Sequence, residues 1–279
     1  MNPTEHPLII LSRRYPQLLL PVRTGMRDTP EYKAAVLEGN RPAGEPDFTM
    51  QAADTLTVVD TPVGPAEVLY LADRGDFEHA LRALAYRCEP VEILPSVGAS
   101  TIRGLINWEK IRRHKSEYLL SGGTDWDAEF ERFAADKANY LDSLLLLSGG
   151  EYSAVPAPEV GMEPEAWCEK SLTIRKYHEL THFVCRGLRP EDVDAVRDEI
   201  LADLIGLAAA FGRYDPALAR RFLGIESGVC RPGGRLSHYT TPEELPAAVQ
   251  RAGGLIEEYA RRIESLAKED VFALLEQIF

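Results

Sequence analysis

The chain has 279 residues, of which 45% are hydrophobic and 27% charged, so it has the length and composition of a folded globular protein with a substantial core. Its net charge of −13 argues against nucleic acid or an anionic membrane as a partner, because phosphate binding requires a basic surface. No apolar run approaches the ~20 residues of a membrane span, the four cysteines form no CxxC pair and the first residues lack a secretory pattern, so we expect a cytoplasmic protein.

The first half of the chain has the pattern of an α/β structure. Proline and turn-forming residues dominate 1–55, with one short helix predicted near 30–38. Alternating β-branched residues over 55–73, interrupted by PVGP, predict a pair of strands. A helix over 76–88 with Asp76 as N-cap and a short buried strand over 90–95 then complete a predicted β-α-β unit.

The next segments predict helices linked by loops. Residues 98–120 begin as a loop, GASTIRGLINW, to which we assign no chemistry, and become helical near Gly104. Residues 124–148 predict one long helix that ends at the glycine pair 149–150. The acidic residues Asp125 and Asp127 fit the start of this helix better than a pair of catalytic carboxylates.

From Glu165 onward every predicted element is a helix. The predicted helices span 164–186, 190–212, 215–224 and 255–278, and TTPEEL at 240–245 is a capping box. We therefore expect an α+β protein, with an α/β N-terminal lobe over 1–163 and an all-helical C-terminal lobe over 164–279.

The sequence HELTH at 178–182 places His178 and His182 four residues apart on a predicted helix. Residues at this spacing share one helical face, and two imidazoles directed at one point suit Zn2+. Glu179 lies beside this point, where it can accept a proton from a water molecule whose pKa the ion lowers. HELTH therefore predicts a metal centre with its own general base; the alternative is an amphipathic helix with two surface histidines.

A third ligand is predicted on the next helix, where Glu199 and Asp203 are also four residues apart in an otherwise apolar segment. A carboxylate buried there without a partner would be costly. The short reversal between 187 and 190 makes the two helices antiparallel, and His178 and Glu199 then both lie ~13 Å from the turn. We expect Glu199 as the third ligand and Asp203 as the acceptor for the second ring N–H of His178.

HELTH followed by ExxxD at 199–203 resembles the gluzincins, the thermolysin-like branch of the zincin metallopeptidases. An α/β lobe followed by a helical lobe is also similar to that architecture. The resemblance implies Zn2+ held by His178, His182 and Glu199, Glu179 as catalytic base, and a peptide or other amide-containing substrate. It also implies that His238 or Tyr239 could stabilise the oxyanion, whereas the segment by itself fits a polar loop before a helix better.

Two non-catalytic interpretations remain open. The helical pair can carry a structural zinc, for which Cys185 or His238 would be the fourth protein ligand. It can also belong to an acidic interaction domain without metal. Tyr177 points ~100° away from His178 on the helix and is expected in the core or at the rim. The sequence predicts neither the oligomeric state nor the identity of the substrate.

Overall fold

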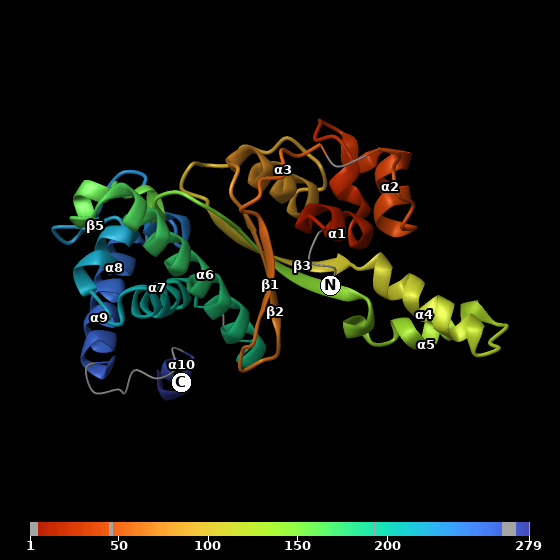
Figure 1. Cartoon of the computed structure of the whole chain (residues 1–279). Coiled ribbons are helices and arrows are strands. Elements are labelled where there is room, and N and C mark those ends of the chain that lie inside the picture. The colour runs from red at the N-terminus through yellow and green to blue at the C-terminus, as the bar shows by residue number, and fades with distance from the viewer. Residues whose placement is uncertain (1–4, 45–46, 192–193, 264–271, 279) are drawn as a thin grey trace. The chain divides into compact units, whose positions relative to one another are not determined.

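A computed structural model describes residues 5–44, 47–191, 194–263 and 272–278 (Figure 1). The chain forms two compact units: unit 1 comprises Met1–Val58, Glu67–Ile93 and Ser100–Ser148, and unit 2 comprises Val59–Ala66, Leu94–Ala99 and Gly149–Phe279. The last passage of the chain from unit 1 to unit 2 lies between Ser148 and Gly149, 15 residues before the division at 163/164 that the sequence predicted.

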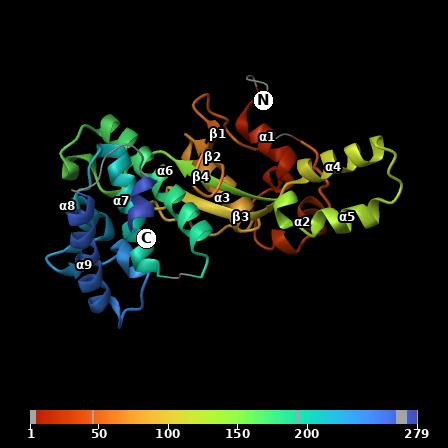
Figure 2. The ribbon, with the colours of Figure 1, turned by 90° about the horizontal axis from the view of Figure 1, so that it is seen from below.

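Unit 1 is built around a mixed sheet. The strands are β1 (Thr55–Val59), β2 (Ala66–Leu71), β3 (Ala99–Ile106) and β4 (Leu141–Ser148), in the order β1-β2-β4-β3 (Figure 2). β2 and β4 are parallel, with Leu69 opposite Leu146. Consecutive leucines 144–147 are all buried, as in a strand that is covered on both faces.

The helices of unit 1 supply the rest of its core. They are α1 (Pro7–Arg14), α2 (Pro30–Leu37), α3 (Arg74–Ala85), α4 (Trp108–Leu120) and α5 (Trp126–Ala134), with 3-10 turns η1 (Pro16–Leu19), η2 (Met26–Asp28) and η3 (Lys137–Asn139). Leu8 and Leu11 of α1 and Phe77 and Leu81 of α3 are fully buried at the helical spacing of an amphipathic face. The predicted helix near 30–38 and the predicted strand pair over 55–73 are confirmed as α2 and as β1 with β2.

The prediction of one long helix over 124–148 was wrong. α5 ends at Ala134, and the chain re-enters the sheet as β4. A short apolar run such as 144–147 fits a buried strand and a buried helix equally well, and pairing with β2 decides for the strand.

Three further predictions in the first half of the chain need correction. Residues 90–95 form no strand, and Val91 and Leu94 are exposed. The strand that pairs with β2 in parallel is β4. Most of 98–106 is strand β3 rather than loop, and Asn107 caps the following helix by accepting the backbone N–H groups of Glu109 and Lys110. The N-cap of α3 is Asp73, which accepts the N–H of Asp76.

Unit 2 is mainly helical. Its helices are α6 (Pro164–Leu188), α7 (Ala195–Phe211), α8 (Pro216–Leu223), α9 (Leu245–Ile263) and α10 (Ala273–Ile278), with 3-10 turns η4 (Tyr152–Ala154), η5 (Ala157–Val160) and η6 (Arg235–His238). β5 (Ile225–Glu226) and β6 (Val229–Cys230) form a small antiparallel hairpin, so the expectation of an all-helical second half was wrong in this segment. None of the helices in the described ranges is long and apolar enough to cross a membrane.

α7 is the central helix of unit 2 and packs along α6. Ile200, Leu201, Leu204, Ile205 and Leu207 are completely buried, so α7 has no solvent-facing side over this length. Gly206 allows the close approach, because a Cβ there would lie 2.8 Å from the backbone oxygen of Ile174. Any carboxylate on this part of α7 therefore needs a partner inside the protein.

Helix ends in unit 2 follow the capping signals with some corrections. α7 begins after Asp194, which accepts the N–H of Arg197, and not at Pro190 as expected; Asp192, placed in its first turn, lies outside the described residues. Gly212 and Gly224 end α7 and α8 in the left-handed conformation, as predicted. The predicted helix 255–278 corresponds to the second part of α9 and to α10, with 264–271 outside the described residues.

Candidate metal centre

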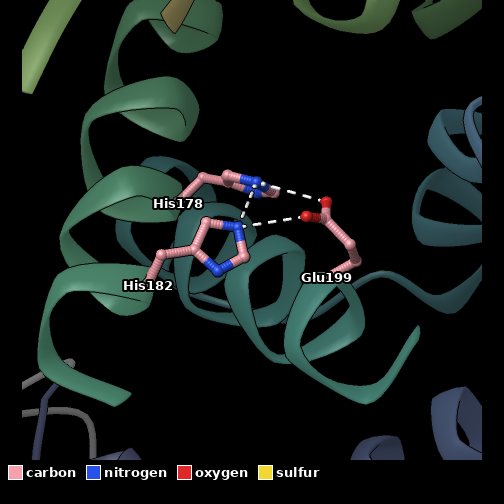
Figure 3. Close-up of side chains that lie close together, drawn as sticks. All are labelled: His178, His182 and Glu199. Atoms are coloured by element: carbon pink, nitrogen blue, oxygen red, sulfur yellow. Dashed lines mark hydrogen bonds and ion pairs between the residues drawn. The ribbon is translucent and has the colours of Figure 1, made fainter. Parts of the chain in front are cut away.

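Three side chains of α6 and α7 converge on one point (Figure 3). The Nε2 atoms of His178 and His182 are 3.0 Å apart. The Oε1 atom of Glu199 lies 3.2 Å from Nε2 of His182, and its Oε2 atom lies 3.4 Å from Nε2 of His178. The structure thus brings together the three residues that the sequence singled out as ligands, from two helices packed along each other.

The distances within this cluster fit a tetrahedral Zn2+ ion. Ligand atoms that are each ~2.0–2.1 Å from such an ion lie ~3.3 Å from one another, close to the three separations observed. The Oε2 atom of Glu199 is buried and has no hydrogen-bond partner among the described residues. A bound cation would pair with this buried carboxylate more closely than the His178 Nε2 atom at 3.4 Å and the Arg235 guanidinium at 3.9 Å do.

The hydrogen bonds of Nδ1 determine which tautomer the neutral His178 ring adopts. The Tyr152 hydroxyl donates its one proton to Oδ1 of Asp203 at 2.6 Å, so it can only accept from Nδ1 of His178, 2.9 Å away. Nδ1 also lies 3.0 Å from Oδ1 of Asp203, which accepts as well. The Nδ1 atom therefore carries a hydrogen, and in the neutral ring the lone pair of Nε2 faces the cluster.

Arg235 closes this network from the 3-10 turn η6. One guanidinium nitrogen donates to Asp203, and the other donates to the Tyr152 hydroxyl at 2.9 Å and to the Ser153 hydroxyl at 3.0 Å. Asp203 is completely buried, so these donors and His178 supply the partners that its charge needs.

A cavity of about 180 Å³ in unit 2 opens next to this cluster. It is lined by Ser96, Val97, Gly98, Ala99, Tyr152, Ser153, Arg175, His178, Glu179, Phe222, Arg231, Gly233, Arg235, His238 and Tyr239. Glu179, the predicted base, and both residues considered for the oxyanion, His238 and Tyr239, therefore line one cavity together with His178. The segment from 98 to 108, to which the sequence assigned no chemistry, contributes Gly98 and Ala99 to the same wall.

The other sequence candidates lie outside the cluster. Among the described residues, the ligand atoms that lie within 4.8 Å of one another belong to His178, His182 and Glu199, and neither Cys185 nor His238 joins them. Tyr177 packs its ring against Phe272, as expected for a residue that points away from the site. Among the described residues, a zinc ion at this point therefore finds no fourth ligand from a histidine, cysteine, aspartate or glutamate.

A family model covers residues 4–277, almost the whole chain; it describes DUF7005, a family of unknown function. The chain belongs to DUF7005. No curated protein and no solved structure matches it significantly. For this DUF7005 chain, arguments about function therefore rest on its own residues and geometry.

Tyr152 and Arg235 are the site residues that sequence reasoning missed. Tyr152 lies in the proline-punctuated connector before α6, and Arg235 is the first residue of η6, directly after a pair of glycines and three residues before His238. Neither occurs at a helical spacing from the motif, so no periodic signal identifies them. The one available hint was Asp203, a buried carboxylate that needs more donors than one imidazole.

Charges in the cluster of this DUF7005 chain shift the pKa values of its members. Burial lowers the pKa of His178, but the charges of Glu199 and Asp203 outweigh it and raise the pKa to about 9. Burial raises the pKa of Glu199, yet the nearby histidines and Arg235 hold it well below its usual range. Without a metal ion, a proton on His178 takes the place between imidazole and carboxylate that a cation would otherwise occupy.

Proposed function

We propose that the protein is a zinc-dependent hydrolase that cleaves a peptide or other amide bond, with a zincin-like helical pair and a cytoplasmic location. The observation that carries the proposal is the convergence of His178, His182 and Glu199 within 3.0–3.4 Å beside a cavity that Glu179 also lines. Three protein donors with an adjoining cavity are typical of a catalytic zinc, whereas structural zinc sites have four protein ligands.

Zn2+ held by these residues would lower the pKa of a bound water molecule and polarise the carbonyl group of the substrate. Glu179 accepts a proton as the water oxygen attacks the carbonyl carbon, and it then donates that proton to the nitrogen as the C–N bond breaks. The products are a carboxylic acid and an amine, and the one proton that is transferred is accepted and returned by the same glutamate.

The remaining residues orient these groups. Asp203 and Tyr152 hold the Nδ1 side of His178 and keep its Nε2 atom directed at the cluster. Burial raises the pKa of Tyr239, and the charges of Glu199 and Asp203 add to this against the opposing effect of Arg235, so its phenol keeps its proton. A protonated Tyr239 in the cavity wall can donate a hydrogen bond to the negative oxygen that develops during attack, a role that His238 at the same wall can share.

Metal analysis together with one variant tests this function. Protein purified without a histidine tag should contain close to one equivalent of zinc, and Glu179→Gln should retain the zinc while losing hydrolysis of amide substrates, because the base is lost and the ligands are not. The matched control is Glu169→Gln, which changes an exposed glutamate of α6 outside the cavity and should keep full activity. Protein with no zinc, or a fully active Glu179→Gln variant, would contradict the proposal.

A further inference from the structure

The charge of the cavity is opposite to that of the whole chain. The chain carries a net charge of −13, yet the cavity wall includes three arginines, Arg175, Arg231 and Arg235, and one carboxylate, Glu179. A cation held by the neighbouring cluster would make this region still more positive. A local reversal of charge on an acidic protein favours an anionic ligand over a neutral or cationic one.

Two of the three arginines make their hydrogen bonds within the protein. Arg175 donates to the backbone oxygens of Gly150 and Glu151 at 2.7 and 2.6 Å and is 4% exposed. Arg235 donates to Asp203 and Tyr152. Asp203 balances the charge of Arg235, and the hydrogen bonds of both guanidinium groups are directed at the protein.

Arg231 differs from these two arginines. Its side chain is 42% exposed, and its ion pair with Glu226 spans 4.0 Å between two solvent-exposed groups. An exposed pair at this distance contributes little to stability and gives way readily to a better-placed anion. Arg231 is therefore the cavity-lining guanidinium best suited to bind a ligand.

The backbone holds Arg231 in a fixed position. Its N–H donates to the oxygen of Gly224 at 2.8 Å, and its own oxygen accepts from the N–H of Gly234 at 2.8 Å. Gly224 and Gly234 pack so closely that a Cβ on Gly224 would lie 2.5 Å from the Cα of Gly234. The turn thus fixes the backbone from which the Arg231 side chain extends, so binding does not have to order the main chain at this position.

Arg231 lines the same cavity, of about 180 Å³, as Glu179 and His178. An anionic group bound by Arg231 therefore lies in the same cavity as the reacting amide, and close to it along the substrate. We propose that the substrate carries a free carboxylate within one residue of the scissile amide, as in a peptide C-terminus or an N-acyl amino acid, and that Arg231 binds this carboxylate. This inference rests on the proposed hydrolase function.

A pair of metal-binding probes tests the inference without requiring turnover. The probes are the monohydroxamate of succinic acid, which has a free carboxylate, and the same compound with a primary amide in place of that carboxylate. Binding of each to zinc-loaded full-length protein is measured by calorimetry. The acid should bind at least about tenfold more tightly than the amide, as expected for one charge-assisted hydrogen-bonded pair.

Arg231→Gln should remove this preference by weakening the acid alone, and Arg231→Lys should restore part of it. Arg221→Gln is the control, because this side chain is also 42% exposed but lies outside the cavity wall, and the preference should persist there. Equal affinity of the two probes for the unaltered protein, or an unchanged preference in Arg231→Gln, overturns the inference while leaving the hydrolase proposal intact. Failure of both probes to bind zinc-loaded protein overturns the open metal site and the inference together.

Discussion

At the scale of single residues, the Tyr152 hydroxyl lies within hydrogen-bond distance of three partners: Asp203, Nδ1 of His178 and the guanidinium of Arg235. It donates to the first and accepts from the other two. Burial raises the pKa of Tyr152 well above its ordinary value, so the phenol keeps the proton that this arrangement requires. The hydroxyl group therefore helps to fix both the tautomer and the orientation of a predicted zinc ligand.

Tyr152→Phe removes this hydroxyl without changing the shape of the ring. We expect the zinc affinity to fall about tenfold, the lower end of the effect seen when a residue that supports a metal ligand is lost. Competition with a fluorescent chelator measures the zinc affinity of the variant and of the parent. Tyr214→Phe is the control, because the buried Tyr214 hydroxyl has no hydrogen-bond partner in the described part of the chain, and its zinc affinity should not change. Equal losses in the two variants would contradict a specific role for Tyr152.

At the scale of elements, the packing of α7 along α6 sets the position of Glu199 relative to the two histidines. α7 begins at Ala195, later than the sequence predicted, and the reversal from α6 is correspondingly longer. Glu199 consequently lies between the two histidines, 3.2 and 3.4 Å from their Nε2 atoms, and not opposite His178 alone. The close approach at Gly206 keeps this register.

Gly206→Ala should therefore destabilise the protein by roughly 1–3 kcal/mol, because the new methyl group meets the backbone of Ile174 and the helices have to separate. Denaturant unfolding measures the loss, and zinc affinity should fall with it as Glu199 moves away from α6. Gly254→Ala is the matched change in α9, where a Cβ meets nothing within 4 Å. That variant should be as stable as the parent or up to about 1 kcal/mol more stable, since alanine favours the helix. A Gly206→Ala variant that is as stable as the parent would contradict this account of the packing.

At the scale of the whole molecule, proton and metal binding are linked to folding. The pKa of His178 is about 9 in the folded, metal-free protein and near 6.5 when unfolded, so its protonated form stabilises the fold. This contribution is complete below pH 6.5 and is lost as the pH rises towards 9. The lowered pKa values of Glu199 and Asp203 act in the acid range, outside this window.

The metal-free protein should therefore lose stability between pH 6.5 and 9, whereas the stabilisation gained on adding zinc should grow over the same range, because zinc no longer has to displace a proton from His178. Unfolding by urea at several pH values, with zinc or with chelator, measures both trends. In His178→Gln the change with pH should be smaller and the zinc effect weak. The same pH dependence in that variant would assign the titration to another group.

The sequence by itself determined the helical parts of the candidate site. HELTH and ExxxD rest on i, i+4 spacing, which fixes side-chain direction within one helix whatever surrounds it, so His178, His182, Glu199 and Asp203 were identified before any fold was known. The capping residues that end α7 and α8 act through equally local hydrogen bonds.

Only the tertiary structure decided which distant residues complete the site and which apolar runs become strands. Tyr152 lies 51 residues from Asp203 and Arg235 lies 32 residues from it, and no local pattern encodes these contacts because loops bring them together. Leucines 144–147 likewise became a strand through pairing with β2. Local geometry follows from covalent structure and short-range hydrogen bonds, whereas long-range pairing depends on the packing of the complete chain.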